Sequence, residues 1–258
     1  MPSILVDRDG PVLRLTFNRP DVRNAFDEGM IADLTAAAAQ AAADATLRAV
    51  VIAGAGKAFC SGADLAWMSK AIAYTHRENL SDAEDLARML ERLDTLPVPV
   101  IGRVHGAALG GGVGLTAICD VVIAADDSVF GLSEVKLGII PAVISPYVIR
   151  KIGVSASREL FLTGSRFSAA RGCAIGLVHE VVPAAGLDAA VERRLKDVLE
   201  AGPKAIAAAK TLIREIAGEH PNDVIGFTTN SIAAQRVSAE GQEGIRAFLE
   251  KRKPGWIS

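Results

Sequence analysis

The sequence predicts an α/β protein in which a repeated ββα core is followed by a helical C-terminal part. Up to about residue 150, short apolar runs bounded by glycine or proline alternate with helical segments. Beyond that point almost every segment has the pattern of a helix. The chain has 258 residues, half of them hydrophobic, which is enough for one sizeable core.

Strand signals are concentrated in the first part of the chain. Residues 4–8 and 12–17 are rich in strand formers and flank Asp9-Gly10, a dipeptide typical of hairpin turns, so we expect them to pair. Residues 48–54, 98–104 and 119–124 are short apolar runs that indicate buried strands. Shorter extended segments are expected at residues 129–132 and 178–182.

Helices are expected between these strands and throughout the C-terminal part. Residues 27–44 are rich in alanine, which favours one long helix. Ser81 and Glu84 have the spacing of a capping box, so we expect the next long helix to run from Ser81 to about Leu96. The other expected helices are residues 63–68, 155–162, 168–175, 187–199, 203–216, 222–237 and 240–251. We divide the chain into a core, residues 1–195, and a C-terminal helical region, residues 196–258.

Charge and cysteine content exclude several classes of protein. The net charge is −2, so no global positive field attracts nucleic acid or an anionic membrane. The three cysteines, Cys60, Cys119 and Cys173, form no CxxC pair, which argues against a zinc site or a disulfide framework. No apolar run reaches the length of a membrane span. We therefore expect a cytoplasmic protein without a metal, a nucleic-acid partner or a membrane partner.

Residues 104–114 form a glycine-rich run, and four of its last five residues are glycine. Glycine is costly between a buried strand and a buried helix, because it loses extra backbone entropy on folding. It also allows a ligand to approach the N–H groups at a helix N-terminus. The run therefore indicates either tight helix–strand packing or a binding site.

Residues 54–65 form a second strand–turn–helix corner built from small residues. This corner lacks the Gly-Lys-Ser/Thr ending of a phosphate-binding loop. It can expose a backbone N–H near Gly62-Ala63, and two such N–H groups aimed at one point form an oxyanion hole for a thioester carbonyl. The alternative is that both corners are ordinary connections.

Glu134 lies in a largely apolar segment, residues 130–141. A carboxylate that is desolvated there has a raised pKa and is a useful general base. The alternative is that Glu134 pairs with Lys136 or Arg150 on the surface.

Taken together, these segments resemble the crotonase superfamily of enoyl-CoA hydratases and isomerases. The similarity runs in family order along essentially the whole chain. The matching pieces are residues 18–20, 24–25, 58–65, 97–101, 106–112, 119–120, 130, 134, 137–141, 162–164 and 247–252. The resemblance implies a ClpP-like ββα-spiral core and a C-terminal helical trimerisation region. It also implies a homotrimer or homohexamer that acts on a coenzyme A thioester and holds no permanent cofactor.

The resemblance also implies roles for individual residues. The oxyanion hole falls on the N–H groups of Ala63 and Gly111, and Glu134 is the acid–base residue. The Ala142 N–H is expected to help position a water molecule. The remaining positions implied to bind the substrate or its coenzyme A part are Arg23, Ala25, Ser61, Asp64, Leu65, Ala66, Gly114 and Lys251.

Gly114 is a departure from the pattern of the superfamily's hydratases, which typically carry a second glutamate there. A lone glutamate is typical of the Δ3,Δ2-enoyl-CoA isomerases. In contrast, residues 63–68, 78–83, 110–115, 132–135 and 140–147 are similar to bacterial methylglutaconyl-CoA hydratases of leucine degradation, which also tend to lack the second glutamate.

Three functions follow from these similarities: a single-glutamate hydratase, an isomerase, and a non-catalytic CoA- or RNA-binding protein. A methylglutaconyl group has a distal carboxylate that needs a cation. The candidates for that cation are Lys70, His105, Arg150 and Lys151.

Overall fold

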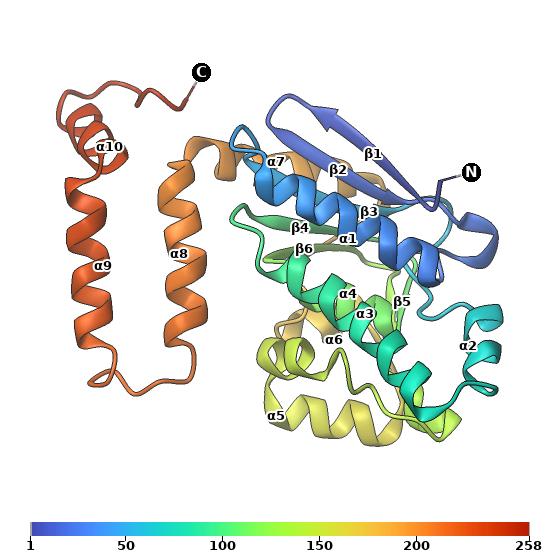
Figure 1. Ribbon diagram of the computed structural model, residues 1–258. Coiled ribbons are helices and arrows are strands. Elements are labelled where there is room, and N and C mark those ends of the chain that lie inside the picture. The colour runs from blue at the N-terminus through green and yellow to red at the C-terminus, as the bar shows by residue number, and fades with distance from the viewer. Residues whose placement is uncertain (1, 258) are drawn as a thin grey trace.

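A six-stranded sheet forms the centre of the computed structural model, which describes residues 2–257 (Figure 1). Strands β1 (Ile4–Asp9) and β2 (Val12–Phe17) form an antiparallel hairpin. The sheet continues from β2 through parallel strands, in the order β3 (Ala49–Gly54), β4 (Val100–Val104), β6 (Val121–Ala125) and β9 (Glu180–Val182). The expected hairpin and the expected strands of this sheet are confirmed.

A smaller sheet packs beside the first and consists of β5 (Ala107–Leu109), β7 (Val129–Gly131) and β8 (Arg166–Ser168). The sequence predicts only β7. Strands β5 and β8 have three residues each, and their pairing with β7 depends on contacts between segments distant in the chain. An isolated bridge between Cys60 and Ala108 joins β5 to the segment that follows β3.

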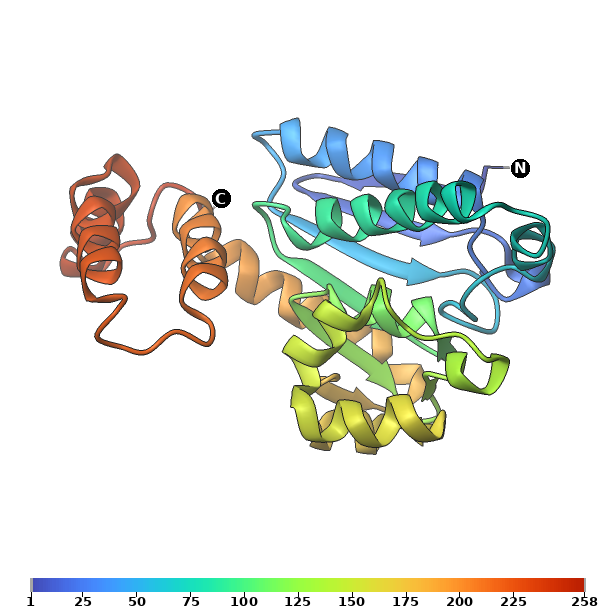
Figure 2. The ribbon, with the colours of Figure 1, turned by 60° about the horizontal axis from the view of Figure 1, so that its bottom comes forward.

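Helices cover both faces of the large sheet, so its central strands are buried on both sides. On one face, α1 (Glu28–Ala43) and α3 (His76–Asp94) lie side by side (Figures 1 and 2). On the other, α7 (Leu187–Glu200) packs against a separate apolar cluster that includes Val51 and Ile101. The mixed α/β architecture that we expected is confirmed.

The start of α3 corrects one expectation. The capping box is formed by Thr75 and Glu78, not by Ser81 and Glu84: the Glu78 N–H donates to Thr75 Oγ1 over 3.3 Å, and the Thr75 N–H donates to Glu78 Oε2 over 2.7 Å. The helix therefore begins at His76, and Ser81 lies inside it. Both tetrads have the required spacing, and the upstream one caps the helix because Thr75 has the extended backbone of an N-cap.

The other connections along the chain carry short helices: α2 (Leu65–Ala71), α4 (Gly111–Ala117), α6 (Ala169–Ala174) and the 3-10 turns η1 (Pro20–Val22), η2 (Glu134–Leu137) and η3 (Ala184–Gly186). Of these, α4 and α6 connect one sheet to the other. Helix α5 (Ser145–Thr163) extends further than expected, because a second helical stretch precedes Gly153, whose φ of 74° interrupts the helix. The sequence predicts only the part after this glycine.

Three helices follow the core and stand away from it (Figures 1 and 2). They are α8 (Pro203–Ile216), α9 (Ile225–Val237) and α10 (Ala239–Leu249), and all three were expected. Neither α8 nor α9 buries a residue fully. Eight large apolar side chains of α8, α9 and α10 are exposed: Ile213, Ile225, Phe227, Ile232, Val237, Ile245, Phe248 and Leu249. Within residues 2–257, no helix has both the length and the apolar character needed to cross a bilayer.

Lys210 is a polar link between α8 and the core. Its ammonium group donates to the Asp120 carboxylate over 2.6 Å and to the Val98 carbonyl over 3.0 Å. The same carboxylate accepts the N–H of Val100, at the start of β4. Since the Lys210 and Asp120 side chains are 15% and 32% exposed, this link is partly shielded from water.

We expect Lys210→Met to lower the free energy of unfolding by about 1–3 kcal/mol, because it leaves a partly buried carboxylate without its cation. Thermal and denaturant unfolding of the purified variant would measure this loss. Lys204→Met is the matched control, since Lys204 is exposed on the same helix. Equal stability of the two variants would contradict a role for Lys210 in docking α8.

Candidate active site

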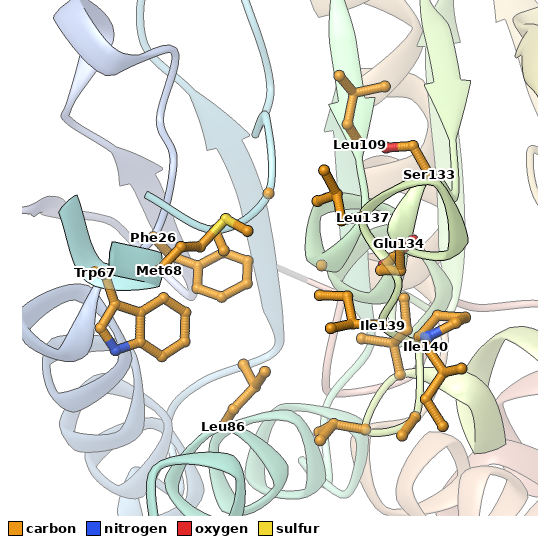
Figure 3. Close-up of a pocket in the computed structure, with 18 of the residues that line it drawn as sticks. Phe26, Trp67, Met68, Leu86, Leu109, Ser133, Glu134, Leu137, Ile139 and Ile140 are labelled. Carbon is orange, nitrogen blue, oxygen red and sulfur yellow. The ribbon is translucent and has the colours of Figure 1, made fainter. Parts of the chain in front are cut away.

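A cavity of about 480 Å³ opens between α2 and the segment that joins η2 to α5 (Figure 3). One wall carries Phe26, Trp67 and Met68, and the facing wall carries Leu109, Ser133, Glu134 and the apolar residues that follow (Figure 3). Of the residues predicted to form the site, six line this cavity: Ser61, Ala63, Leu65, Gly111, Glu134 and Ala142. The structure therefore brings together the three segments that the sequence singled out.

The first wall is fixed by Asp64, which caps α2. Its carboxylate accepts the N–H groups of Ala66 and Trp67 and pairs with Arg19 over 3.0 Å. This cap directs Trp67 inward, where its ring lies 5.5 Å from the ring of Phe26. Asp64 thus positions Trp67 through the helix that it caps, and it does not line the cavity itself.

The glycine-rich run reaches the cavity at the N-terminus of α4. Gly110 has a φ of 51°, and Gly111 is the first residue of the helix. A Cβ on Gly111 would lie 2.3 Å from the Phe26 ring, and one on Gly112 would lie 2.3 Å from the Cys60 carbonyl oxygen. Both interpretations of the run therefore apply, with tight packing at Gly112 and access to the cavity at Gly111.

Two backbone N–H groups border the cavity without an acceptor. Ala63 forms an isolated bridge with Phe26, yet this bridge is made by the N–H groups of Phe26 and Asp64. Among residues 2–257, neither the Ala63 N–H nor the Gly111 N–H donates a hydrogen bond. Since both residues line the same cavity, these donors are available to a ligand oxygen.

Glu134 begins η2 and is half-buried. Burial raises the pKa of its carboxyl group, and Oε2 is buried without a hydrogen-bond partner in the described part of the chain. The alternative of a surface ion pair is wrong: Arg150 pairs with Asp94, and neither Arg150 nor Lys136 forms a salt bridge with Glu134. The geometry therefore provides a desolvated carboxylate that faces the cavity.

Gly114 is enclosed by protein. A Cβ on this residue would lie 2.3 Å from Cγ2 and 2.8 Å from Cβ of Ile144, which is 3% exposed and lines the cavity. Gly114 itself is buried and does not line the cavity. The position of the missing second glutamate is thus filled with hydrocarbon.

Ala142 requires a correction. It lines the cavity, but its N–H donates to the Ile140 carbonyl over 2.8 Å, so this N–H is not free to position a water molecule. The sequence does not show this bond because it arises from the local turn before α5.

The remaining residues expected to bind the ligand lie outside the cavity lining. Arg23 is exposed after η1, and its carbonyl accepts the Ser61 N–H. Ala25 is buried, and Ala66 is exposed on α2. Lys251 follows α10, at the opposite end of the molecule from α2 (Figure 1). Within one chain the structure does not bring Lys251 to the site.

The four cations considered for a distal carboxylate also lie outside the lining. Lys70 pairs with Glu28, and Arg150 pairs with Asp94. The Lys151 ammonium donates to the Cys119 carbonyl, and His105 Nε2 contacts the Gly56 carbonyl at 2.9 Å. The lining contains no lysine, arginine or histidine. In residues 2–257, no three His, Cys, Asp or Glu side chains cluster in a way that could hold a metal ion.

Several apolar residues of the site were not predicted: Phe26, Leu86, Leu109, Leu137, Ile139, Ile140 and Ile144. In sequence they look like ordinary core residues. Leu137, Ile139 and Ile140 are 63%, 51% and 71% exposed, so they stand at the cavity mouth and not in the core. Nothing in their spacing distinguishes these two roles.

The chain is similar to proteins of known family over its whole length. The family model for enoyl-CoA hydratase/isomerase matches residues 7–258. The 2,3-dehydroadipyl-CoA hydratase of Escherichia coli is 34% identical over 259 residues, covering 98% of each chain. A solved enoyl-CoA hydratase from Shewanella pealeana is 39% identical with a TM-score of 0.95, covering 98% of this chain and 96% of that one.

A solved enoyl-CoA hydratase from Mycobacterium smegmatis is 32% identical, also with a TM-score of 0.95, and the match covers all of both chains. The crotonase fold expected from the resemblance is therefore confirmed. Together with a cavity that joins Glu134 to two free backbone donors, these similarities show that the chain is an enzyme of the enoyl-CoA hydratase/isomerase family.

Proposed function

We propose that this enzyme adds water across the 2,3 double bond of an enoyl-CoA thioester that has an apolar acyl group. The observation that carries the proposal is a single half-buried carboxylate, that of Glu134, whose Oε2 is buried in a cavity that also offers the unused N–H groups of Ala63 and Gly111. The names of its relatives as enoyl-CoA hydratases support the same reaction.

In the proposed mechanism, the N–H groups of Ala63 and Gly111 bind the thioester oxygen. Negative charge develops on this oxygen when a nucleophile attacks C3, and fixed donors in an apolar cavity stabilise that charge. Glu134 removes a proton from water, the resulting hydroxide attacks C3, and the protonated Glu134 then donates a proton to C2 of the enolate. These two proton transfers need only one carboxylate, which acts first as a base and then as an acid.

A water molecule needs a second partner besides Glu134. The Ala142 N–H is already used, so we assign this part to Ser133, which stands on the same wall as Glu134 (Figure 3). Its hydroxyl does not cap η2 and therefore has capacity for a water molecule.

The cavity lining favours an apolar acyl group over a methylglutaconyl group. A distal carboxylate buried among Leu, Ile, Phe and Trp side chains without a cation would lose its hydration uncompensated. The four cations considered for it are held elsewhere. We therefore expect saturated hydrocarbon substituents to bind better than acidic ones.

Δ3,Δ2-enoyl-CoA isomerisation is the second candidate. Two observations favour it: hydrocarbon fills the second glutamate position, and the Ala142 N–H is not available to water. Family membership makes a non-catalytic CoA- or RNA-binding role a weaker explanation than either enzyme.

We further propose that residues 196–258 mediate self-association into a homotrimer or homohexamer. The exposed apolar side chains of α8–α10 support this, because monomeric proteins rarely expose so many neighbouring apolar side chains to water. In such an assembly Lys251 would contact the coenzyme A of a neighbouring copy, whereas Arg23, Ser61 and Leu65 would contact that of their own. A cytoplasmic location fits this proposal.

The test is turnover of purified protein with crotonyl-CoA, methylglutaconyl-CoA and a 3-enoyl-CoA. Hydration removes the enoyl absorbance of the first two and incorporates oxygen from labelled water. Conversion of the 3-enoyl-CoA without label would instead support isomerisation. If neither reaction occurs, the proposed function is wrong.

We expect Glu134→Gln to lower kcat by about 10²–10⁴-fold, because the amide cannot exchange protons. In the wild type, kcat/KM should fall on the acid side with an apparent pKa above 4.5, the ordinary value, because burial raises the pKa of Glu134. A wild-type rate that is flat through this range, or an active Glu134→Gln variant, would remove Glu134 from the mechanism.

The same raised pKa predicts that the Glu134→Gln variant is more stable than the wild type at high pH. The contribution of Glu134 to stability is fully present below its unfolded pKa and is lost as pH rises through the raised folded pKa. The unfolding temperature of Glu134→Gln should therefore equal that of the wild type at acid pH and exceed it at about pH 8. Glu219→Gln, at an exposed position, is the control and should show no such pH-dependent difference.

Gly111→Ala should reduce kcat by about 10²–10³-fold, the usual effect of losing one oxyanion donor. The new Cβ would lie 2.3 Å from the Phe26 ring, so the first turn of α4 or the ring must move. Gly186→Ala adds the same atom directly before α7, at a position where nothing lies within 4 Å and φ is −96°, and it should leave kcat unchanged. Similar kinetics of the two variants would argue against Gly111 as a donor.

A further inference from the structure

Ile144 packs on α4 at Gly114, which has no side chain. It would meet a Cβ on Gly114 at 2.3 Å, it is 3% exposed, and it lines the cavity. Its carbonyl accepts the Val148 N–H at the start of α5, so its backbone is part of a helix N-terminus. Ile144 is therefore a fixed wall of the cavity.

The position of this wall relative to the chemistry follows from helix geometry. Gly111 and Gly114 are three residues apart and lie on the same face of α4, separated by about 4.5 Å along the axis. An acyl group whose oxygen binds at the Gly111 N–H has C3 and C4 two and three bonds beyond its carbonyl carbon. Ile144 lies at Gly114 and lines the same cavity as Gly111, so an acyl group that runs from the Gly111 N–H along this face of α4 passes beside it.

Other apolar residues of the cavity cannot restrict the acyl group in the same way. Ile139 and Ile140 are 51% and 71% exposed at the mouth, so their side chains are free to move away from a bulky substrate. A side chain packed as closely as Ile144 has no such freedom, because close-packed interiors resist displacement.

We propose that Ile144 is a specificity-determining residue that selects straight acyl groups over acyl groups branched at C3. It also occupies the volume that a second acid–base side chain on residue 114 would need. This inference rests on the proposed binding of the thioester oxygen at Ala63 and Gly111, and it adds the residue that decides which substituents fit beside the reacting carbons.

The test compares kcat/KM for 3-methylcrotonyl-CoA with that for crotonyl-CoA. We expect the branched-to-straight ratio to rise by about 10–100-fold in Ile144→Ala, which is the range for small changes of volume in an apolar pocket. Ile144→Val, the milder variant, should raise it less. Ile140→Ala removes the same atoms at the mouth and should leave the ratio within about twofold of the wild type. An unchanged ratio in both Ile144 variants, or an equal rise in Ile140→Ala, would overturn the inference.

Binding of unreactive thioesters separates this inference from the proposed reaction. Calorimetry with 3-methylbutyryl-CoA and butyryl-CoA should show the same change of preference in Ile144→Ala, even if the wild type turned over no enoyl-CoA. Failure of turnover with this preference intact would refute the reaction and keep the role of Ile144. Turnover by the wild type without any change of preference in Ile144→Ala would support the reaction and refute the role of Ile144.

The packing itself is testable by thermal unfolding. Gly114→Ala should destabilise the wild type but have little effect in an Ile144→Gly background, where the clashing atoms are gone. Gly112→Ala is the control, because its Cβ would meet the Cys60 backbone carbonyl at 2.3 Å, which Ile144→Gly cannot relieve. If Gly114→Ala lowered the melting temperature equally in both backgrounds, Ile144 would not occupy the proposed volume.

Discussion

The close approach of α4 to the segment after β3 is the constraint on which the site depends. The absence of a side chain at Gly112 lets the helix lie against the Cys60 carbonyl, where any Cβ would be only 2.3 Å from the oxygen. The Cys60 carbonyl also accepts the Leu109 N–H, so β5 and this segment are joined directly before the helix begins. As a result, the N–H groups of Gly111 and Ala63 border one cavity although their segments are distant in the chain.

The desolvation of Glu134 follows from the same arrangement. The loop that carries Glu134 continues from β7, which pairs with β5, so the position of the carboxylate is set by the glycine-rich run. Its Oε1 would lie in tight contact, at 3.2 Å, with a Cβ on Gly110, whose φ of 51° already favours glycine. The apolar wall then shields the carboxylate from water and raises its pKa, which is the direction that suits the proposed general base.

The sequence predicts those parts of the fold that depend on local pattern. The hairpin β1–β2, the parallel strands and the C-terminal helices have clear periodicity or turn residues. Strands β5 and β8 and the first part of α5 do not, because three-residue strands and a helix broken at Gly153 are defined by distant partners. The two candidate capping boxes show the limit of reasoning from spacing, since both have the correct spacing and Thr75 is distinguished by its extended backbone, which the sequence does not show.

The candidate site shows the same division. Glu134, Ala63 and Gly111 were predicted because their motifs are continuous in sequence, whereas Ile144 was not, because its importance lies in a contact with Gly114. Because of that contact, the absence of a glutamate at residue 114 depends on the residue at position 144. A glutamate at 114 needs a small residue at 144, and a buried isoleucine at 144 needs glycine at 114, so the two positions must change together. The single carboxylate of this cavity is therefore a property of a packed pair, and the same pair fixes the shape of the cavity wall at Gly114.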